Sequence, residues 1–149
     1  MRLLDEHHVP VPVTLPQVLA ATLRSRGQEE AYVGPGEHLA WNELEAQSRR
    51  IAAGLHAAGI RKGDHVGLML GNSGLWIAAF FTCASIGAVT VPVNTRFKAE
   101  ELAFCLKQAD VKLLLYADSF LGLDFTALLR LVEPAVDDQL PGRFAVDME

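Results

Sequence analysis

Residues 66–95 contain no charged side chain, and this segment limits the folds open to the chain. The segment is long enough to cross a bilayer, which needs about 20 apolar residues. However, it is interrupted by Gly-Asn-Ser-Gly at 71–74, by Gly87 and by Pro92, and the flanking charges show no clear excess of Lys and Arg on one side. The apolar pieces that remain have the lengths of strands and one short helix. The segment therefore favours the buried core of an α/β protein, and we expect no membrane span.

Apolar residues in the rest of the chain alternate between strand spacing and helix spacing. We expect helices at about 14–25, 41–58, 74–86, 99–106 and 123–131, and strands at 66–70, 88–91 and 111–117. Residues 31–33 and 38–41 flank Gly-Pro-Gly-Glu and predict a small β-hairpin near residues 31–41. This order is typical of an α/β fold with a mainly parallel sheet and helices on both faces. We assign 1–133 to one α/β subdomain and expect 134–149 to be irregular.

Local signals predict how the 41–58 helix begins and ends. Asn42 and Glu45 have the spacing of a capping box at its start. Gly59 follows the helix as a terminating glycine, and Ile60 can pack back on Leu55 as in a Schellman motif.

The Gly-Asn-Ser-Gly sequence at 71–74 joins a predicted strand to a predicted helix, where glycine loops often bind phosphate. Residues 67–74 read Gly-x-x-x-Gly-x-x-Gly, which matches neither the dinucleotide fingerprint nor the NTPase phosphate loop. No lysine follows the loop, and no acidic residue lies about 20 positions further on. We therefore expect the loop to turn the chain, with Ser73 capping the following helix.

Composition excludes several other functions. The formal net charge is −5 and no dense basic run occurs, so we expect no nucleic-acid partner. The N-terminus lacks the apolar region of a secretory signal. Cys83 and Cys105 have no metal-like spacing, and we interpret them as small core residues of a cytoplasmic protein. The histidines share no metal-ligand spacing and no serine lies in a G-x-S-x-G elbow.

Residues 39–116 carry an ordered set of short motifs. They are Ala52-x-Gly54-Leu55 with Gly59, Gly63-Asp64-x-Val66, Asn72-Ser73, Gly87-Ala88, Pro92-x-Asn94-x-Arg96 and Glu101-Leu102. In this order and at these spacings, the set resembles the N-terminal region of the acyl-adenylate-forming enzymes, the AMP-dependent synthetase/ligase superfamily. The uncharged helix and Pro-Val-Asn-Thr-Arg at 92–96 look most like the acyl-CoA synthetase (fatty-acid–CoA ligase) branch.

The resemblance implies a parent enzyme that joins a carboxylic acid, expected to be a fatty acid, to ATP with Mg²⁺ and then transfers the acyl group from acyl-AMP to CoA. The family's phosphate loop, its ribose-binding acid and its catalytic lysine come later than residue 149, and no Ser-Gly-Thr-Thr-Gly-like run occurs here. We therefore expect an N-terminal fragment that is inactive alone, with no catalytic residue, no metal ligand and no tightly bound cofactor. Apolar surface left by the missing remainder predicts self-association. The alternative is a stand-alone, non-catalytic α/β module used for binding or assembly.

One residue of the motif set is a candidate for ligand binding. Arg96 follows a predicted strand at the carboxyl edge of the sheet, where open α/β sheets bind ligands. The resemblance implies that an arginine here can approach the phosphates of CoA, whereas a structural arginine would bond loop carbonyls instead. We expect the Asn94 side chain to fix the loop, and we expect Trp76, Phe80 and Phe81 to be core residues rather than an acyl pocket.

Overall fold

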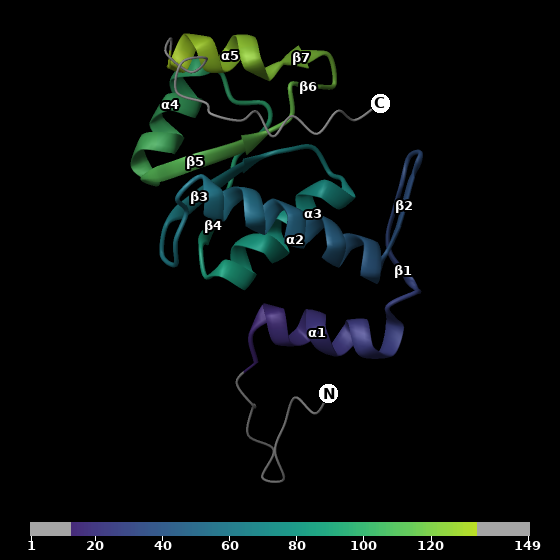
Figure 1. Ribbon diagram of the computed structural model, residues 1–149. Coiled ribbons are helices and arrows are strands. Elements are labelled where there is room, and N and C mark those ends of the chain that lie inside the picture. Colours follow the sequence, from purple (N-terminus) through teal and green to yellow (C-terminus); the bar gives the residue numbers. More distant parts are fainter. Residues whose placement is uncertain (1–12, 134–149) are drawn as a thin grey trace, which may run out of the picture.

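Three parallel strands form the central sheet of the molecule (Figure 1). In the computed structural model, which describes residues 13–133, β3 (His65–Met69) lies between β4 (Val89–Pro92) and β5 (Val111–Tyr116). Because β3 is paired on both edges and covered on both faces, every residue from 66 to 70 is buried. The uncharged segment is thus the centre of an α/β core, as its sequence predicts.

One face of the sheet is covered by α2 (Trp41–Ala57) and α3 (Gly74–Ile86). Leu55 of α2 and Val66 of the central strand belong to the same buried cluster, which also includes residues of α3. The first helix, α1 (Leu15–Arg26), packs on the far side of α2 and α3, so it forms an outer layer at the bottom of Figure 1.

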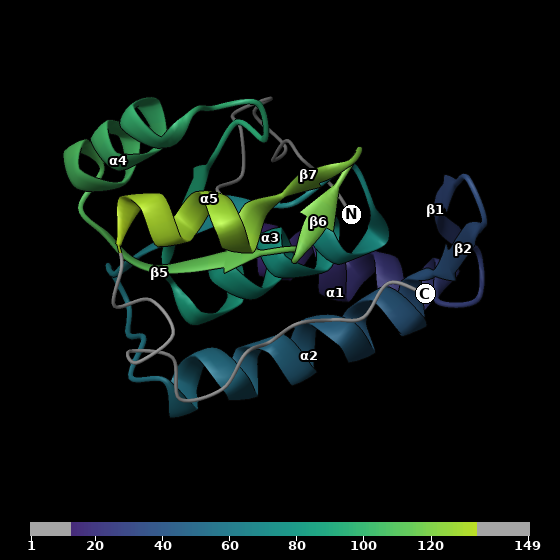
Figure 2. The ribbon, with the colours of Figure 1, turned by 90° about the horizontal axis from the view of Figure 1, so that it is seen from above.

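The opposite face is covered by α4 (Ala99–Gln108) and α5 (Phe125–Val132). Leu102 of α4, the first residue of α5 and Met69 of the central strand are fully buried together. Figure 2 shows α5 running along β5 on this face, with α2 on the other side of the sheet. The predicted parallel sheet with helices on both faces is confirmed.

Two antiparallel hairpins flank the parallel sheet. The predicted hairpin consists of β1 (Glu30–Gly34) and β2 (Glu37–Ala40). A second hairpin, β6 (Ser119–Phe120) with β7 (Leu123–Asp124), was not predicted, and it delays the start of the last helix from 123 to 125. Its turn places Leu121 at a positive φ of 50°, a conformation that leucine seldom adopts and that sequence patterns do not signal.

The predicted cap of α2 is wrong. An N-cap at Asn42 would start the helix at residue 43. The helix instead begins at Trp41, and Ala40 is the N-cap residue. Glu43 supplies one half of a capping box, because its carboxylate accepts a hydrogen bond of 2.8 Å from the Ala40 backbone N–H. The N–H of Asn42 itself donates to the Gly27 carbonyl at 2.9 Å. Strand β2 therefore leads directly into the helix.

The predicted end of α2 is confirmed. Gly59 has a φ of 84°, and its N–H donates to the His56 carbonyl at 3.1 Å. The N–H of Ile60 donates to the Leu55 carbonyl at 2.9 Å, and both side chains are buried in the same cluster. These are the two hydrogen bonds and the apolar contact of a Schellman motif.

Helix α3 buries its small residues and half-buries its large ones. Ala78, Ala79, Thr82 and Cys83 are fully buried, which allows close packing between α3 and its neighbours. Trp76 stacks on Phe80 with ring centroids 5.7 Å apart. These rings pack against the hydrophobic core as partly buried residues, which agrees with the predicted core role.

The structural description covers neither residues 1–12 nor the irregular tail predicted at 134–149. Across the described part of the chain, every helix falls short of the length and apolar character that a membrane span requires.

Candidate functional site

The carboxyl edge of the sheet is formed by three loops that follow β3, β4 and β5. In open parallel sheets this edge is where ligands bind, because the loops and helix N-termini that can hold a ligand gather there. The central loop, 70–73, leads into α3, and residues 93–98 lead into α4. The third connection follows β5 and contains the short β6–β7 hairpin.

Arg96 lies in the loop after β4, within a tight turn at 95–96. The turn is held by Asn94, whose side-chain Oδ1 accepts a hydrogen bond of 3.0 Å from the Arg96 backbone N–H. The Asn94 carbonyl also accepts a hydrogen bond of 3.2 Å from Phe97 N–H. This is an Asx-type turn, so Asn94 fixes the loop as the sequence predicts.

The Arg96 side chain is exposed at this edge. Within residues 13–133 its guanidinium forms no hydrogen bond and no ion pair, so the loop-carbonyl contacts of a structural arginine do not occur there. The turn instead holds the backbone and leaves the five N–H donors of the guanidinium available to a ligand.

The loop at 71–74 is occupied by contacts from the chain itself. Ser73 Oγ accepts a hydrogen bond of 3.2 Å from Trp76 N–H, which confirms the predicted cap. Oε2 of Glu37, from the β1–β2 hairpin, accepts a hydrogen bond of 3.1 Å from Gly74 N–H. A carboxylate therefore lies at the helix N-terminus where a bound phosphate would lie. The loop turns the chain, as its sequence predicts.

Two glycines of this loop are closely packed against side chains of other elements. A Cβ atom on Gly71 would lie 2.1 Å from the Phe120 ring, and one on Gly74 would lie 2.1 Å from Leu39. The Tyr32 hydroxyl donates to the Asn72 carbonyl at 3.1 Å, so the first hairpin contacts this loop through Tyr32 as well. No local sequence pattern predicts these partners, because they lie far away in the sequence.

The Gly-Asp motif at 63–64 lies at the opposite, amino edge of the sheet. Asp64 Oδ2 accepts hydrogen bonds of 2.7 Å from both Arg61 N–H and Lys112 Nζ. The hydrogen bond from Lys112 and that from Arg61 N–H lower the pKa of the Asp64 carboxyl below its usual value. Gly63 adopts a positive φ of 88° that allows this turn. The motif is therefore structural, and it ties the start of β3 to the start of β5.

Other reactive side chains give no second site. Cys83 is buried, and burial raises the pKa of its thiol, which makes it a poor nucleophile. Cys105 is a half-buried free thiol. Within residues 13–133, no three His, Cys, Asp or Glu side chains converge on a point that a metal ion could occupy.

Comparison with known proteins places these features in a family. Residues 19–142 match the family model described as AMP-binding enzyme. The acyl-CoA synthetase homologue YngI of Bacillus subtilis is 33% identical over 132 residues, which cover 87% of this chain and 24% of that protein. A long-chain-fatty-acid–CoA ligase of Mycobacterium tuberculosis is 38% identical over 89 residues, covering 58% of this chain and 18% of the ligase.

Solved structures show the same fold. The N-terminal domain of FACL13 from Mycobacterium tuberculosis, in an inhibitor-bound crystal structure, has a TM-score of 0.67 and 29% identity, covering 84% of this chain and 29% of that one. The anthranilate CoA ligase AuaEII in complex with anthranoyl-AMP has a TM-score of 0.72 and 22% identity, covering 93% of this chain and 25% of that one. The match thus covers between 18% and 29% of the length of these proteins.

Proposed function

The chain belongs to the AMP-binding enzyme family, and we propose that it forms the N-terminal part of an ATP-dependent acyl-CoA synthetase. The observation that carries this proposal is the family match over residues 19–142, together with the acyl-CoA ligase names of the relatives. The whole reaction would use a carboxylic acid, ATP, Mg²⁺ and CoA. It would yield acyl-AMP and pyrophosphate first, and then acyl-CoA and AMP.

Arg96 is the residue of this chain that we propose to contact a substrate. Its guanidinium is exposed at the carboxyl edge and has no partner among residues 13–133, which suits a phosphate of CoA. The bonds to Asn94 hold the Arg96 backbone, so the side chain would be presented at low entropic cost. The N-terminus of α3 does not suit a phosphate, because the Glu37 carboxylate lies there.

The acid substrate is proposed to be a fatty acid. The support is the name of the Mycobacterium tuberculosis relative, a long-chain-fatty-acid–CoA ligase. The rings of Trp76 and Phe80 pack in the core and are not assigned to an acyl pocket. We propose a cytoplasmic location, which is supported by the two free cysteines.

The ATP-dependent step is proposed to need residues outside this chain. Neutralising phosphate charge requires a donor-rich loop, a metal-binding acid and a lysine. We assign no Mg²⁺ ligand within residues 13–133, where no acidic cluster converges. These 149 residues alone should therefore make no acyl-AMP.

The experiment that tests the proposal uses the full-length parent protein. Incubation with ATP, Mg²⁺, CoA and a panel of carboxylic acids should give AMP and an acyl-CoA in equal amounts, measured by liquid chromatography and mass spectrometry. Fatty acids should be the best substrates of the panel. Formation of no acyl-AMP and no acyl-CoA from any acid would refute the proposed reaction.

A further inference from the structure

The outer face of α4 carries an exposed stripe of mixed chemistry. Its members are Glu100, Glu101, Phe104, Lys107 and Gln108, and all five are exposed. The other members lie three or four residues before or after Phe104, so they share one face of the helix with it. Leu102 of the same helix is fully buried in the core, so the stripe is the side that points away from the protein.

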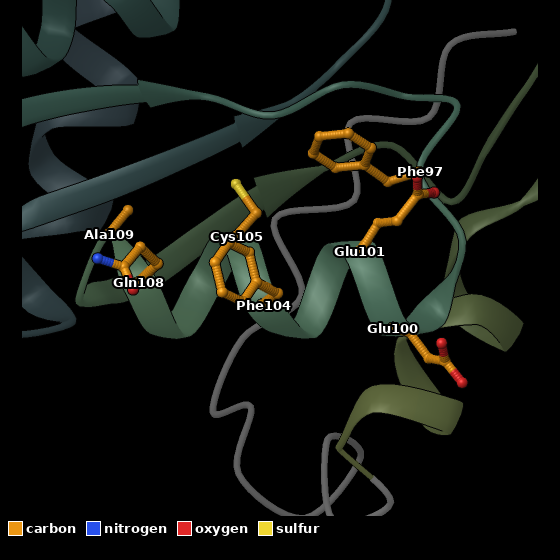
Figure 3. Close-up of a pocket in the computed structure, with 7 residues that line it drawn as sticks. All are labelled: Phe97, Glu100, Glu101, Phe104, Cys105, Gln108 and Ala109. Atoms are coloured by element: carbon orange, nitrogen blue, oxygen red, sulfur yellow. The ribbon is translucent and has the colours of Figure 1, made fainter.

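Phe104 stands at the centre of this stripe with 69% of its surface exposed. Beside it a hollow of about 710 Å³ opens between Phe97, Phe104 and Cys105 (Figure 3). An exposed phenylalanine next to an apolar hollow is typical of a contact surface, because a partner that covers the ring removes apolar area from water.

Charge varies along the stripe in a definite direction. Glu100 and Glu101 lie in the first turn of α4, whereas Lys107 and Gln108 lie in the last turn, with Phe104 midway between them. A second copy of α4 laid antiparallel, with the two Phe104 rings at the two-fold axis, would bring Glu101 opposite Lys107 of the second copy. Glu100 would lie opposite Gln108 of the second copy. A parallel arrangement would bring glutamate against glutamate.

We infer that α4 is a dimerisation surface that binds a second copy of this chain in the antiparallel orientation. The same patch serves both copies, as two-fold symmetry requires. The two Phe104 rings pack against each other beside the hollows, and two Glu101–Lys107 pairs form at the rim. The inference goes beyond the proposed reaction, and it names the surface behind the self-association predicted from the sequence.

The dimer should be weak. Helix α4 has 10 residues, which corresponds to about 15 Å of contact length. Such a contact buries less than the ~1,200 Å² of stable complexes, so we expect a transient dimer that dissociates on dilution. The rim pairs are exposed and mainly set orientation, whereas Phe104 supplies most of the affinity.

Sedimentation velocity of the full 149-residue chain over a concentration series tests this surface. Wild type should show a concentration-dependent monomer–dimer equilibrium. Phe104→Asp should raise the dissociation constant at least tenfold. Leu131→Asp is the matched control, because Leu131 of α5 is 74% exposed and lies outside the stripe, and it should leave dimerisation unchanged.

Charge reversal tests the orientation. Glu101→Lys and Lys107→Glu should each weaken their own homodimer by roughly five- to tenfold, because like charges then face each other. Mixing the two variants should restore association, because each rim of the heterodimer then pairs one lysine with one glutamate. Circular dichroism confirms that each variant is folded.

Three results would overturn the inference. They are a monomer at all concentrations up to about 1 mM, equal effects of Leu131→Asp and Phe104→Asp, and no gain of association when the charge variants are mixed. A surface that instead binds only the rest of the parent chain would give the first of these results. None of them bears on acyl-CoA formation, so the proposed function is tested separately.

Discussion

The Glu37 carboxylate accepts a hydrogen bond from the backbone N–H of Gly74 at 3.1 Å, across 37 residues of sequence. The β1–β2 hairpin thereby closes the N-terminus of α3. A second contact, from the Tyr32 hydroxyl to the Asn72 carbonyl, holds the hairpin on the same loop. The 71–74 loop is therefore shaped by its own chain rather than by a phosphate.

Glu37→Ala should lower the free energy of unfolding by about 1–2 kcal/mol, because it removes a charge-assisted cap from a partly buried N–H. Glu37→Gln should cost less, since the amide oxygen can still accept the bond. Urea unfolding of both variants measures the difference. Glu29→Ala is the control, because within residues 13–133 the Glu29 side chain forms only an exposed ion pair with Arg26. Equal losses for Glu37→Ala and Glu29→Ala would contradict the cap.

Asp64→Asn should lower the thermal midpoint at pH 7, because it removes the negative partner of Lys112. The Lys112 and Arg61 bonds lower the pKa of Asp64 in the folded state. The stabilisation is therefore fully present above the unfolded pKa of about 3.9 and is lost as the pH falls through the folded value. The difference in thermal midpoint between wild type and Asp64→Asn should accordingly become smaller below about pH 4.

Calorimetry at several pH values measures this difference. Asp110→Asn is the matched control, because Asp110 is exposed and forms no ion pair among residues 13–133. Its thermal midpoint should stay close to wild type throughout. If the thermal midpoints of wild type and Asp64→Asn differ equally at pH 7 and pH 3, titration of the Asp64 carboxylate does not contribute to stability.

Sequence patterns predicted most of the fold because the relevant signals are local. The end of α2 was predictable from the left-handed Gly59 followed by Ile60, which packs on Leu55. The start of α3 was predictable from Ser73. Asn42 failed as a cap because pairing of Ala40 with β1 carries the chain straight into the helix. A capping pattern does not reveal where a preceding strand ends.

The remaining contacts depend on tertiary structure. Lys112 reaches Asp64 across 48 residues, and no local pattern marks that pair. The β6–β7 hairpin turns through a left-handed Leu121, where sequence rules expect glycine or asparagine. For the candidate site, the Asn94 turn was predictable, whereas the Glu37 carboxylate at the α3 N-terminus was not.

The purified 149-residue chain should show no ATP–pyrophosphate exchange with any carboxylic acid. The proposed reason is that the groups that would hold the triphosphate lie outside this chain. The full-length parent, assayed in parallel, is the positive control. Acid-dependent exchange by the 149-residue chain would show that this part of the protein holds ATP after all.

We propose that the carboxyl edge of this sheet forms part of the CoA site of an acyl-CoA synthetase, and the KM for CoA of the parent enzyme with Arg96→Ala measures the contribution of this edge. A charge-assisted phosphate contact contributes roughly 1.5–3 kcal/mol, so the KM for CoA should rise about ten- to a hundredfold. Pyrophosphate release in the first half-reaction should change little, and Arg96→Lys should recover part of the loss. An unchanged KM for CoA in a stably folded Arg96→Ala enzyme would contradict the claim.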